Sequence, residues 1–551
     1  MPGSDDLDLF WAKSVDDGAG SLPVTQHADD VASIITVVAQ RMVAPGQLRR
    51  LQSNLGGVEL SKVLRFAAAS HDVGKVSAYF QPKVDGLYSR VRRAGYTAEL
   101  ISPEDLRKVP HSLVSARAAK SWFSSRATTS SRKSLRGWQN VLGGHHGAFP
   151  STSPPTLDSE DSNWSEARMR FLDRAAAQLG LSQEDIDALA TLPWTAADQV
   201  LITGILIAAD WVGSNEKYFP YNDYELGLPA NERLERALDA LDLGGTWHPQ
   251  QTSELTFAER FGLPEGSARR SVQQAGYQTA RAQSEPSLFL IENETGGGKT
   301  ETAFEMAEVL AQKLDLNGVF IAQPTRMTSD AMFDRTATWL EHTTDAGSPL
   351  STILAHGKAQ ANDHYRAIMP EGRLSAIYDE SAQGGLEATQ WFRGRKTGLL
   401  ASVVVGTIDQ LLYASLQSKH AMLRHLGLAS KVVILDEVHA ADAFMRTFLD
   451  NALEWLAAYG VPVIALSATL PPAQREELVD AYLRGAATAN PEQAEGGEPG
   501  DVTRNHRRRS RTTGNSATRA SPSPAAQGYA PISQNRTAGG AALPWSTLTV
   551  T

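Results

Sequence analysis

The chain has 551 residues, of which 42% are hydrophobic, so it is long enough for several folded domains with ordinary cores. Its formal net charge of -10 gives no overall attraction to nucleic acid, although a binding groove needs only a local basic patch. The absence of cysteine excludes disulfides and thiolate metal sites. Any bound metal must therefore be held by histidine, aspartate and glutamate.

Targeting and membrane signals are also missing from the sequence. No window approaches the roughly 18 consecutive apolar residues of a membrane-spanning helix. The acidic start, Met1 to Asp8, lacks the basic and then apolar layout of a signal peptide. We therefore expect a cytoplasmic protein with no membrane partner.

Four segments differ in their sequence pattern. Residues 1–217 alternate apolar helical patterns with polar loops and predict an all-α domain. Residues 218–285 are charged and partly helical, which is typical of a connector. Residues 286–485 alternate short β-rich runs with amphipathic stretches and predict an α/β lobe with a parallel sheet. Residues 486–551 have almost no aliphatic residues, so we expect a disordered tail.

The first chemical motif, His71-Asp72-Val73-Gly74-Lys75, closes an apolar helical pattern in the predicted all-α domain. On a helix, adjacent residues diverge by about 100°, so His71 and Asp72 can ligate neighbouring metals or flank one metal. Five further candidate ligands lie at motif-like places in the same domain: His27, His111, His145, His146 and Asp210.

Imidazole and carboxylate ligands without thiolate suit iron, manganese, cobalt, nickel or zinc. Seven candidates exceed the needs of one metal and favour two, which together can cleave a phosphodiester. Asp72 is then a catalytic ligand, and Lys75 is predicted to neutralise a phosphate oxygen. The simpler interpretation, that a single histidine is a surface or hydrogen-bonded residue, applies most to His27 and His111.

The second motif is a glycine-rich loop between an apolar run and a helical pattern, the context of a phosphate-binding loop. Lys299 is predicted to reach the β and γ phosphates and Thr300 to hold magnesium. Asn293 stands where the usual pattern has its first glycine. Asp436 would hold magnesium, and the neighbouring Glu437 would activate water as a catalytic residue. The predicted ATP-binding residues are Thr295, Gly296, Gly297, Gly298, Lys299, Thr300, Asp436, Glu437 and His439.

Three further strand-end segments complete a series that resembles superfamily 2 DExH helicases. They are Gln323-Pro324-Thr325-Arg326, Val405-Gly406-Thr407-Ile408-Asp409-Gln410 and Ser467-Ala468-Thr469. The resemblance implies that Thr325, Arg326 and Thr407 hold the phosphate backbone of one DNA strand. It also implies that Ser467 and Thr469 couple this strand to the ATP site. The alternative is that these residues only cap strand ends and form turns.

The order of the histidine and aspartate motifs resembles the HD-domain phosphohydrolases and, more narrowly, the nuclease domain of the type I CRISPR-associated helicase-nuclease. The resemblance covers about residues 1–484. It implies a single-stranded DNA nuclease with two divalent transition metals (iron, manganese, cobalt or nickel), coupled to a helicase that uses ATP with magnesium. It further implies recruitment by a CRISPR RNA-guided surveillance complex in antiviral defence.

The sequence departs from this family after Ser467-Ala468-Thr469. A superfamily 2 motor needs a second RecA-like lobe, which supplies an arginine finger. We find no Gln-x-x-Gly-Arg-x-x-Arg pattern, and residues 486–551 have the composition of an altered reading frame. We expect a truncated or frameshifted product, or a second lobe carried by another chain. A non-catalytic remnant and an HD phosphohydrolase of small nucleotides remain alternative functions.

Overall fold

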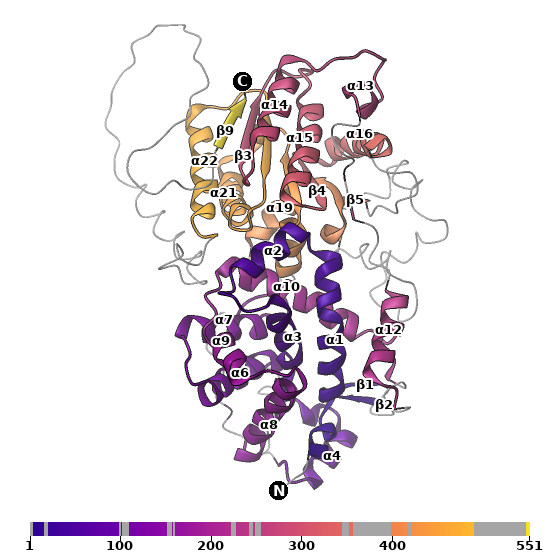
Figure 1. Cartoon of the computed structure of the whole chain (residues 1–551), viewed down its shortest axis with the longest axis vertical. Coiled ribbons are helices and arrows are strands. Elements are labelled where there is room, and N and C mark those ends of the chain that lie inside the picture. The colour runs from indigo at the N-terminus through magenta and orange to yellow at the C-terminus, as the bar shows by residue number, and fades with distance from the viewer. Residues whose placement is uncertain are drawn as a thin grey trace, which may run out of the picture.

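The chain folds into a helical domain and an α/β lobe that pack end to end (Figure 1). The computed structural model describes residues 4–15, 20–97, 101, 109–150, 157, 160–221, 227–241, 246–247, 249, 255–343, 352–355, 398–416, 421–489 and 547–550.

The helical domain is built from α-helices and 3-10 helices with one small antiparallel pair of strands, β1 and β2. Its elements are η1 (Ser4–Leu9), β1 (Trp11–Val15), β2 (Gly20–Pro23), α1 (Val24–Met42), α2 (Pro45–Ser53), α3 (Leu60–Ser70), η3 (Val73–Lys75), η4 (Gln81–Lys83), α4 (Asp85–Arg93), α6 (His111–Arg126), α7 (Arg132–Gly143), α8 (Ser162–Gln178), α9 (Gln183–Leu189) and α10 (Ala196–Gly213). The predicted helical fold is confirmed, with the β1–β2 pair as an addition.

Helix α10 forms the centre of this domain because it is apolar on almost every side. Thr195 and Asp198 begin it with a reciprocal capping box. Its length and composition would also allow a membrane span, but 83% of the relevant window is buried inside the protein. It packs against α1 and α3 of its own domain. The helix is therefore explained as a core helix.

Between the two parts, the described residues include α12 (Ala230–Ala240), α13 (Phe257–Arg260) and α14 (Ser271–Ala282). The lobe then contains β3 (Leu288–Glu292), α15 (Lys299–Leu314), β4 (Gly318–Gln323), α16 (Arg326–Thr343), β5 (Thr352–Ala355), η7 (Gly398–Leu400), β6 (Val403–Thr407), α19 (Ile408–Leu412), η8 (Tyr413–Ser415), α20 (Ala421–Ala429), β7 (Lys431–Leu435), η9 (Val438–Ala440), α21 (Ala443–Ala458), β8 (Val463–Ser467), α22 (Pro472–Ala486) and β9 (Thr547–Val550).

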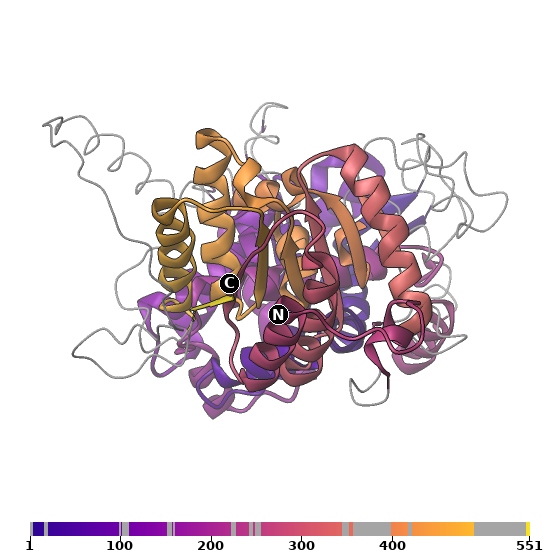
Figure 2. The ribbon, with the colours of Figure 1, turned by 90° about the horizontal axis from the view of Figure 1, so that it is seen from above.

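The strands of the lobe form one parallel sheet in the order β5-β6-β4-β7-β8-β3-β9. Helices cover both faces, as Figure 2 shows from above. Alternate strand residues explain this arrangement: Phe289 and Ile321 belong to the core shared with α15 and α16, whereas Leu290 and Phe320 belong to the core shared with α21 and the helical domain. The predicted parallel α/β lobe is confirmed.

The predicted disordered tail, residues 486–551, lies mostly outside the described residues. The prediction is wrong for Thr547–Val550, which form strand β9. This strand pairs in parallel with β3, from Leu288 opposite Thr547 to Ile291 opposite Val550. The composition of the tail did not reveal this strand because its hydrogen-bond partner is supplied by a sheet edge distant in the sequence.

Helix α2 attaches the helical domain to the lobe. The amide of Gly46 donates to the carbonyl of Asp315 at 3.0 Å, beyond the end of α15. The side chain of Gln47 donates to the carbonyl of Tyr459 at 2.7 Å, beyond the end of α21. Helix α10 also packs against α20 of the lobe. The two parts therefore share a continuous interface.

The close approach at Gly46 gives a first prediction. A Cβ atom at this position would lie 2.0 Å from the carbonyl oxygen of Leu314. We expect Gly46→Ala to separate α2 from the lobe and to lower the free energy of unfolding by about 1–3 kcal/mol, the usual effect of overpacking. Thermal unfolding measures this change. Gly86→Ala is the control, because a Cβ there meets no atom within 4 Å; equal melting temperatures of the two variants would contradict the prediction.

Candidate metal centre and nucleotide site

The seven predicted metal ligands come from five helices and meet at one place in the helical domain. His27 lies in the first turn of α1, His71 and Asp72 between α3 and η3, His111 at the first position of α6, His145 and His146 just after α7, and Asp210 in the last turn of α10. The sequence predicts His71 and Asp72 on one helix, but the structure places both in the turn between α3 and η3. The backbone turns at Asp72, which has φ −102° and ψ 8°.

The first ligand group consists of two imidazoles and two carboxylates: His27, His71, Asp72 and Asp210. The Nε2 atom of His27 lies 3.1 Å from Asp210 Oδ1 and 3.3 Å from Asp72 Oδ2. The Nε2 atom of His71 lies 3.4 Å from Asp72 Oδ2 and 3.6 Å from Asp210 Oδ1. Four donor atoms thus point toward one small volume.

The second group consists of three imidazoles: His111, His145 and His146. The Nε2 atoms of His111 and His146 are 3.0 Å apart. His145 is buried, whereas His146 lies at the exposed rim. This group therefore opens toward solvent, where a substrate can approach.

Asp72 lies between the two groups. Its Oδ2 atom faces His27 and His71, and its Oδ1 atom lies 3.2 Å from His111 Nε2 and 3.6 Å from His145 Nε2. A carboxylate with one oxygen on each side can bridge two metal ions. This geometry divides the seven side chains into two sites joined by one residue.

The imidazoles are oriented by hydrogen bonds to the backbone. The Nδ1 atom of His71 lies 2.7 Å from the Ala68 carbonyl, and that of His145 lies 2.6 Å from the Leu142 carbonyl. Because a carbonyl only accepts, each Nδ1 carries a proton, and a neutral ring then presents the lone pair of Nε2 to the site. Both Nε2 atoms are buried without a hydrogen-bond partner. The residues present therefore fit metal ligation.

The charge distribution agrees with this fit. Burial lowers the pKa of His111 to about 4 and that of His145 to about 3, so both rings are neutral at pH 7 and able to ligate. Burial would also lower the pKa of His71, but the Asp72 and Asp210 carboxylates outweigh it and raise this pKa to about 10. The two buried carboxylates thus stabilise one positive charge at this place, which is either the His71 imidazolium or a metal ion that would replace its Nε2 proton.

Lys75 lies against the central carboxylate of the two ligand groups. Its ammonium is buried, with Nζ 2.6 Å from Asp72 Oδ2 and 3.2 Å from the Ala12 carbonyl. Burial would raise the pKa of Asp72, but Lys75 and then His71 outweigh it and hold this pKa well below its usual range. Lys75 therefore orients the central carboxylate, and contact with a substrate phosphate remains a prediction.

Gly74 brings the His71-Asp72 turn against α6. Its amide donates to Ser115 Oγ at 2.8 Å, and a Cβ atom would lie 2.0 Å from the carbonyl oxygen of His111. Only glycine allows this approach, which sets the distance between Asp72 and His111. The glycine of the motif thus positions a ligand of the second group.

A Gly74→Ala substitution is expected to displace the start of α6 and His111 with it. We predict an at least tenfold weaker manganese affinity and a free energy of unfolding lowered by about 1–3 kcal/mol. Isothermal titration with manganese and thermal unfolding measure the two effects. Gly86→Ala serves again as control, and unchanged manganese affinity in the Gly74 variant would show that the contact is not needed.

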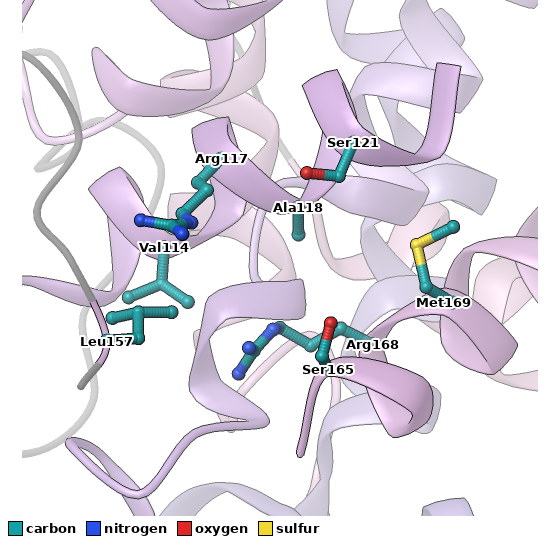
Figure 3. A pocket seen from close by; sticks show the side chains of 8 residues that line it. All are labelled: Val114, Arg117, Ala118, Ser121, Leu157, Ser165, Arg168 and Met169. Carbon is teal, nitrogen blue, oxygen red and sulfur yellow. The ribbon is translucent and has the colours of Figure 1, made fainter. Parts of the chain in front are cut away.

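A cavity of about 30 Å³ lies between α6 and α8, lined by Val114, Arg117, Ala118, Ser121, Leu157, Ser165, Arg168 and Met169 (Figure 3). It holds a few water molecules at most. Arg168 in its wall donates to the Val76 carbonyl at 2.9 Å and pairs with Glu160. The cavity therefore belongs to the structure that supports η3 and is not a substrate site.

The phosphate-binding loop has the backbone conformation that glycine permits. Gly296 and Gly298 have φ of 79° and 89°, and α15 begins directly after them at Lys299. The Nζ atom of Lys299 lies 2.8 Å from the Asn293 carbonyl, inside the loop. Asn293 itself donates to the Gly297 carbonyl at 3.1 Å, so this unusual residue braces the loop. Helix and loop thus form an anion site.

The predicted magnesium and catalytic acids lie beyond the end of β7. Gln323 donates to Asp436 Oδ2 at 2.9 Å and fixes this carboxylate. Glu437 has φ 50°, a conformation that non-glycine residues rarely adopt outside functional sites. The Nδ1 atom of His439 lies 3.1 Å from Ser467 Oγ, and Ser467 donates in turn to the Thr469 carbonyl at 2.8 Å. A hydrogen-bond chain therefore joins the ends of β7 and β8.

The three predicted DNA-backbone residues lie at the ends of adjacent strands. Thr325 and Arg326 follow β4 and are exposed, and Thr407 ends β6. Thr325 Oγ1 also accepts from the Thr328 amide at 3.2 Å, so it caps α16 as the alternative proposed. Parallel strands place all three at one edge of the sheet. Binding of DNA by these residues remains a prediction.

Two residues that contact the phosphate-binding loop are not predicted from the sequence. Arg270 donates to the Gly296 carbonyl at 2.6 Å, and Gln273 donates to the Gly298 carbonyl at 3.4 Å. Both belong to the start of α14, in the segment interpreted as a connector. Their spacing alone is common in helices, so no pattern identified them; only the packing of α14 against α15 does so.

Comparison with known proteins matches two parts of the chain to described families. Residues 11–219 match the family described as Cas3, HD domain, and residues 270–478 match the DEAD/DEAH box helicases. The CRISPR-associated nuclease/helicase Cas3 of Streptococcus thermophilus is 31% identical over 520 residues, which are 87% of this chain and 54% of the relative.

Solved structures show the same likeness. T. fusca Cas3 with ADP has a TM-score of 0.72 at 28% identity and covers 88% of this chain, which spans 53% of that protein. A chain of a CRISPR RNA-guided surveillance complex in a pre-nicking state has a TM-score of 0.61 at 26% identity, covering 87% of this chain and 50% of its own length. The chain thus spans about half the length of the relatives it matches.

Proposed function

We propose that this chain, which belongs to the Cas3 family through its HD domain and its DEAD/DEAH box helicase domain, is a metal-dependent nuclease of single-stranded DNA in CRISPR interference. The position of Asp72 carries the proposal. Its two oxygens face two groups of ligands, and the second group opens toward solvent. This arrangement suits a hydrolase of phosphodiesters, because two bound ions would stabilise both the attacking and the leaving oxygen.

Each ligand group fits one divalent ion, for which we propose iron, manganese, cobalt or nickel. His27, His71, Asp72 and Asp210 would hold one ion, and His111, His145 and His146 with Asp72 would hold the other. Bound ions would supply hydroxide at neutral pH and charge for the scissile phosphate. The protein positions Asp72 through Lys75 and orients the rings of His71 and His145 through backbone carbonyls.

The lobe is proposed to bind ATP with magnesium through Lys299, Thr300 and Asp436, with Glu437 as the residue that activates water. Hydrolysis of ATP in such motors needs an arginine finger from a second RecA-like lobe, worth roughly 10³–10⁵ in rate in related systems. Within the described residues the structure contains one parallel sheet. Translocation by this lobe would depend on a second RecA-like lobe, whereas cleavage in the helical domain would not.

The proposed partner is a CRISPR RNA-guided surveillance complex. Support comes from the likeness to the chain found in such a complex before nicking. In this role the nuclease would act on the DNA strand displaced by the RNA, which is single-stranded and therefore able to reach a buried metal centre.

The test is cleavage of circular single-stranded DNA by the purified chain with manganese, cobalt or nickel, with and without ATP. Because the metal centre lies in the helical domain, cleavage should be abolished by a chelator and independent of ATP. Activity on small nucleotides but not on DNA would instead favour an HD phosphohydrolase. Absence of cleavage with every metal would indicate a non-catalytic remnant.

A further inference from the structure

Several large apolar side chains are exposed on the helices that follow the strands of the lobe. Among the described residues, those with the highest exposure are Leu263, Met327, Tyr413, Leu416 and Phe444. Met327 lies in α16, which directly follows β4. Tyr413 and Leu416 lie in and just after η8, which follows β6 and α19, and Phe444 lies in α21, which follows β7 and η9. These three strands are neighbours in the sheet and run parallel, so their carboxyl ends share one edge.

The two aromatic members are held by packing beneath them. Tyr413 is 46% exposed although Leu411, Leu412 and Ala414 around it are buried. The guanidinium of Arg424 lies 5.4 Å from the Tyr413 ring centre and donates to Gln410 Oε1 at 3.0 Å. The ring is therefore fixed beside a cation at the surface.

Phe444 lies at the start of α21, where it is 73% exposed and contacts the Phe448 ring at 4.8 Å between centres. Helix α21 packs against α19 and η8, the elements that lead to Tyr413. The rings of Phe444 and Tyr413 thus belong to one packed set of helices and both reach solvent.

The position of Tyr413 relative to the predicted DNA-backbone residues indicates which ligand these rings would bind. Tyr413 follows Thr407 by six residues of continuous helical structure, which corresponds to about 9 Å along the axis. This is the distance of one to two nucleotides in an extended strand. Aromatic rings next to a cation and beside backbone-binding groups are the composition of a stacking platform for single-stranded nucleic acid.

We propose that Tyr413, supported by Arg424, and Phe444 stack on bases of the single DNA strand whose backbone contacts Thr325, Arg326 and Thr407. The proposal rests on the proposed nuclease function and adds to it the residues that contact bases. Every base has an aromatic face, so this contact tolerates any sequence. It suits an enzyme that must act on DNA of unrelated sequences.

The experiment compares two fluorescent oligonucleotides of 15 nucleotides by anisotropy: oligo(dT) and an abasic strand with the same phosphates. The unmodified chain should bind oligo(dT) more tightly by about 5- to 150-fold per stacked base. Tyr413→Ala and Phe444→Ala should each reduce this preference, and Tyr413→Trp should keep it. Leu263→Ala, which changes an exposed apolar residue outside these helices, should not alter the preference.

Equal binding of both strands by the unmodified chain, no binding of oligo(dT), or a full preference in both alanine variants would overturn the proposal. The last result would indicate that the edge faces another protein domain. Cleavage of circular DNA, measured in parallel, separates this outcome from a failure of the proposed function. A chain that cleaves DNA but shows no base preference contradicts the stacking platform alone.

Discussion

Asp72→Asn is expected to abolish metal-dependent cleavage of DNA while leaving ATP binding unchanged. The amide keeps the shape of the carboxylate but removes the charge that lies between the two ligand groups. We expect the cleavage rate to fall by a factor on the order of 10³ or more, which corresponds to about 4 kcal/mol of transition-state stabilisation. Cleavage of circular single-stranded DNA with manganese measures the rate.

The substitution also leaves the buried ammonium of Lys75 without its carboxylate. Thermal unfolding must therefore accompany the assay, and the double variant Asp72→Asn with Lys75→Met restores the charge balance. We expect the double variant to be folded and still inactive. Asp85→Asn, at an exposed position of the same domain, is the matched control. A folded Asp72 variant that cleaves within tenfold of the unmodified rate would remove the basis for a bridged metal pair.

Lys299→Met is expected to weaken ATP binding and to leave metal-dependent cleavage of DNA unchanged. The ammonium at the first position of α15 points into the phosphate-binding loop, where it would meet the β and γ phosphates. Loss of one or two charged hydrogen bonds should weaken ATP binding by about 10- to 100-fold. Fluorescence titration with a labelled ATP analogue measures the affinity, and manganese-dependent cleavage of DNA should not change.

Lys313→Met, at the exposed end of the same helix, should bind the analogue like the unmodified chain. The two active-site variants thus form a crossed pair, each losing one activity. If Lys299→Met also stopped cleavage in the absence of ATP, the nuclease site would depend on the loop, and the proposed independence of the two sites would be wrong.

The interface at α2 connects the nuclease site and the nucleotide site structurally, although we expect the two activities to be independent. Gly46 and Gln47 contact the ends of α15 and α21, which begin near Lys299 and Glu437 respectively. Helix α1, joined to α2 after Met42, carries His27. The same elements therefore support both sites, although the sites themselves lie in different domains.

Much of the candidate site was predictable because its residues follow strong local patterns. The phosphate-binding loop is one continuous segment whose glycines determine its backbone, so the positions of Lys299 and Thr300 follow from the sequence. The strand-end motifs after β4, β6, β7 and β8 were predictable for a related reason, since apolar runs identify the buried strands of a parallel sheet.

Residues without a local pattern were not predictable in the same way. Arg270 and Gln273 look like ordinary polar residues of a helix, and they reach the phosphate-binding loop only because α14 packs against α15. Strand β9 has only four residues, Thr-Leu-Thr-Val, whose β-forming pattern is too short to identify a strand without the edge of β3 that pairs with it.

The sequence by itself determined the order of the two domains, the fold class and the set of side chains that can hold metal and nucleotide, because apolar periodicity and glycine content act within a few residues along the chain. Only the tertiary structure decided how these side chains are arranged relative to one another. It placed Asp72 between two ligand groups, buried Lys75 against it and left the rings of Tyr413 and Phe444 exposed. These arrangements depend on contacts between segments far apart in the sequence, which local patterns do not specify.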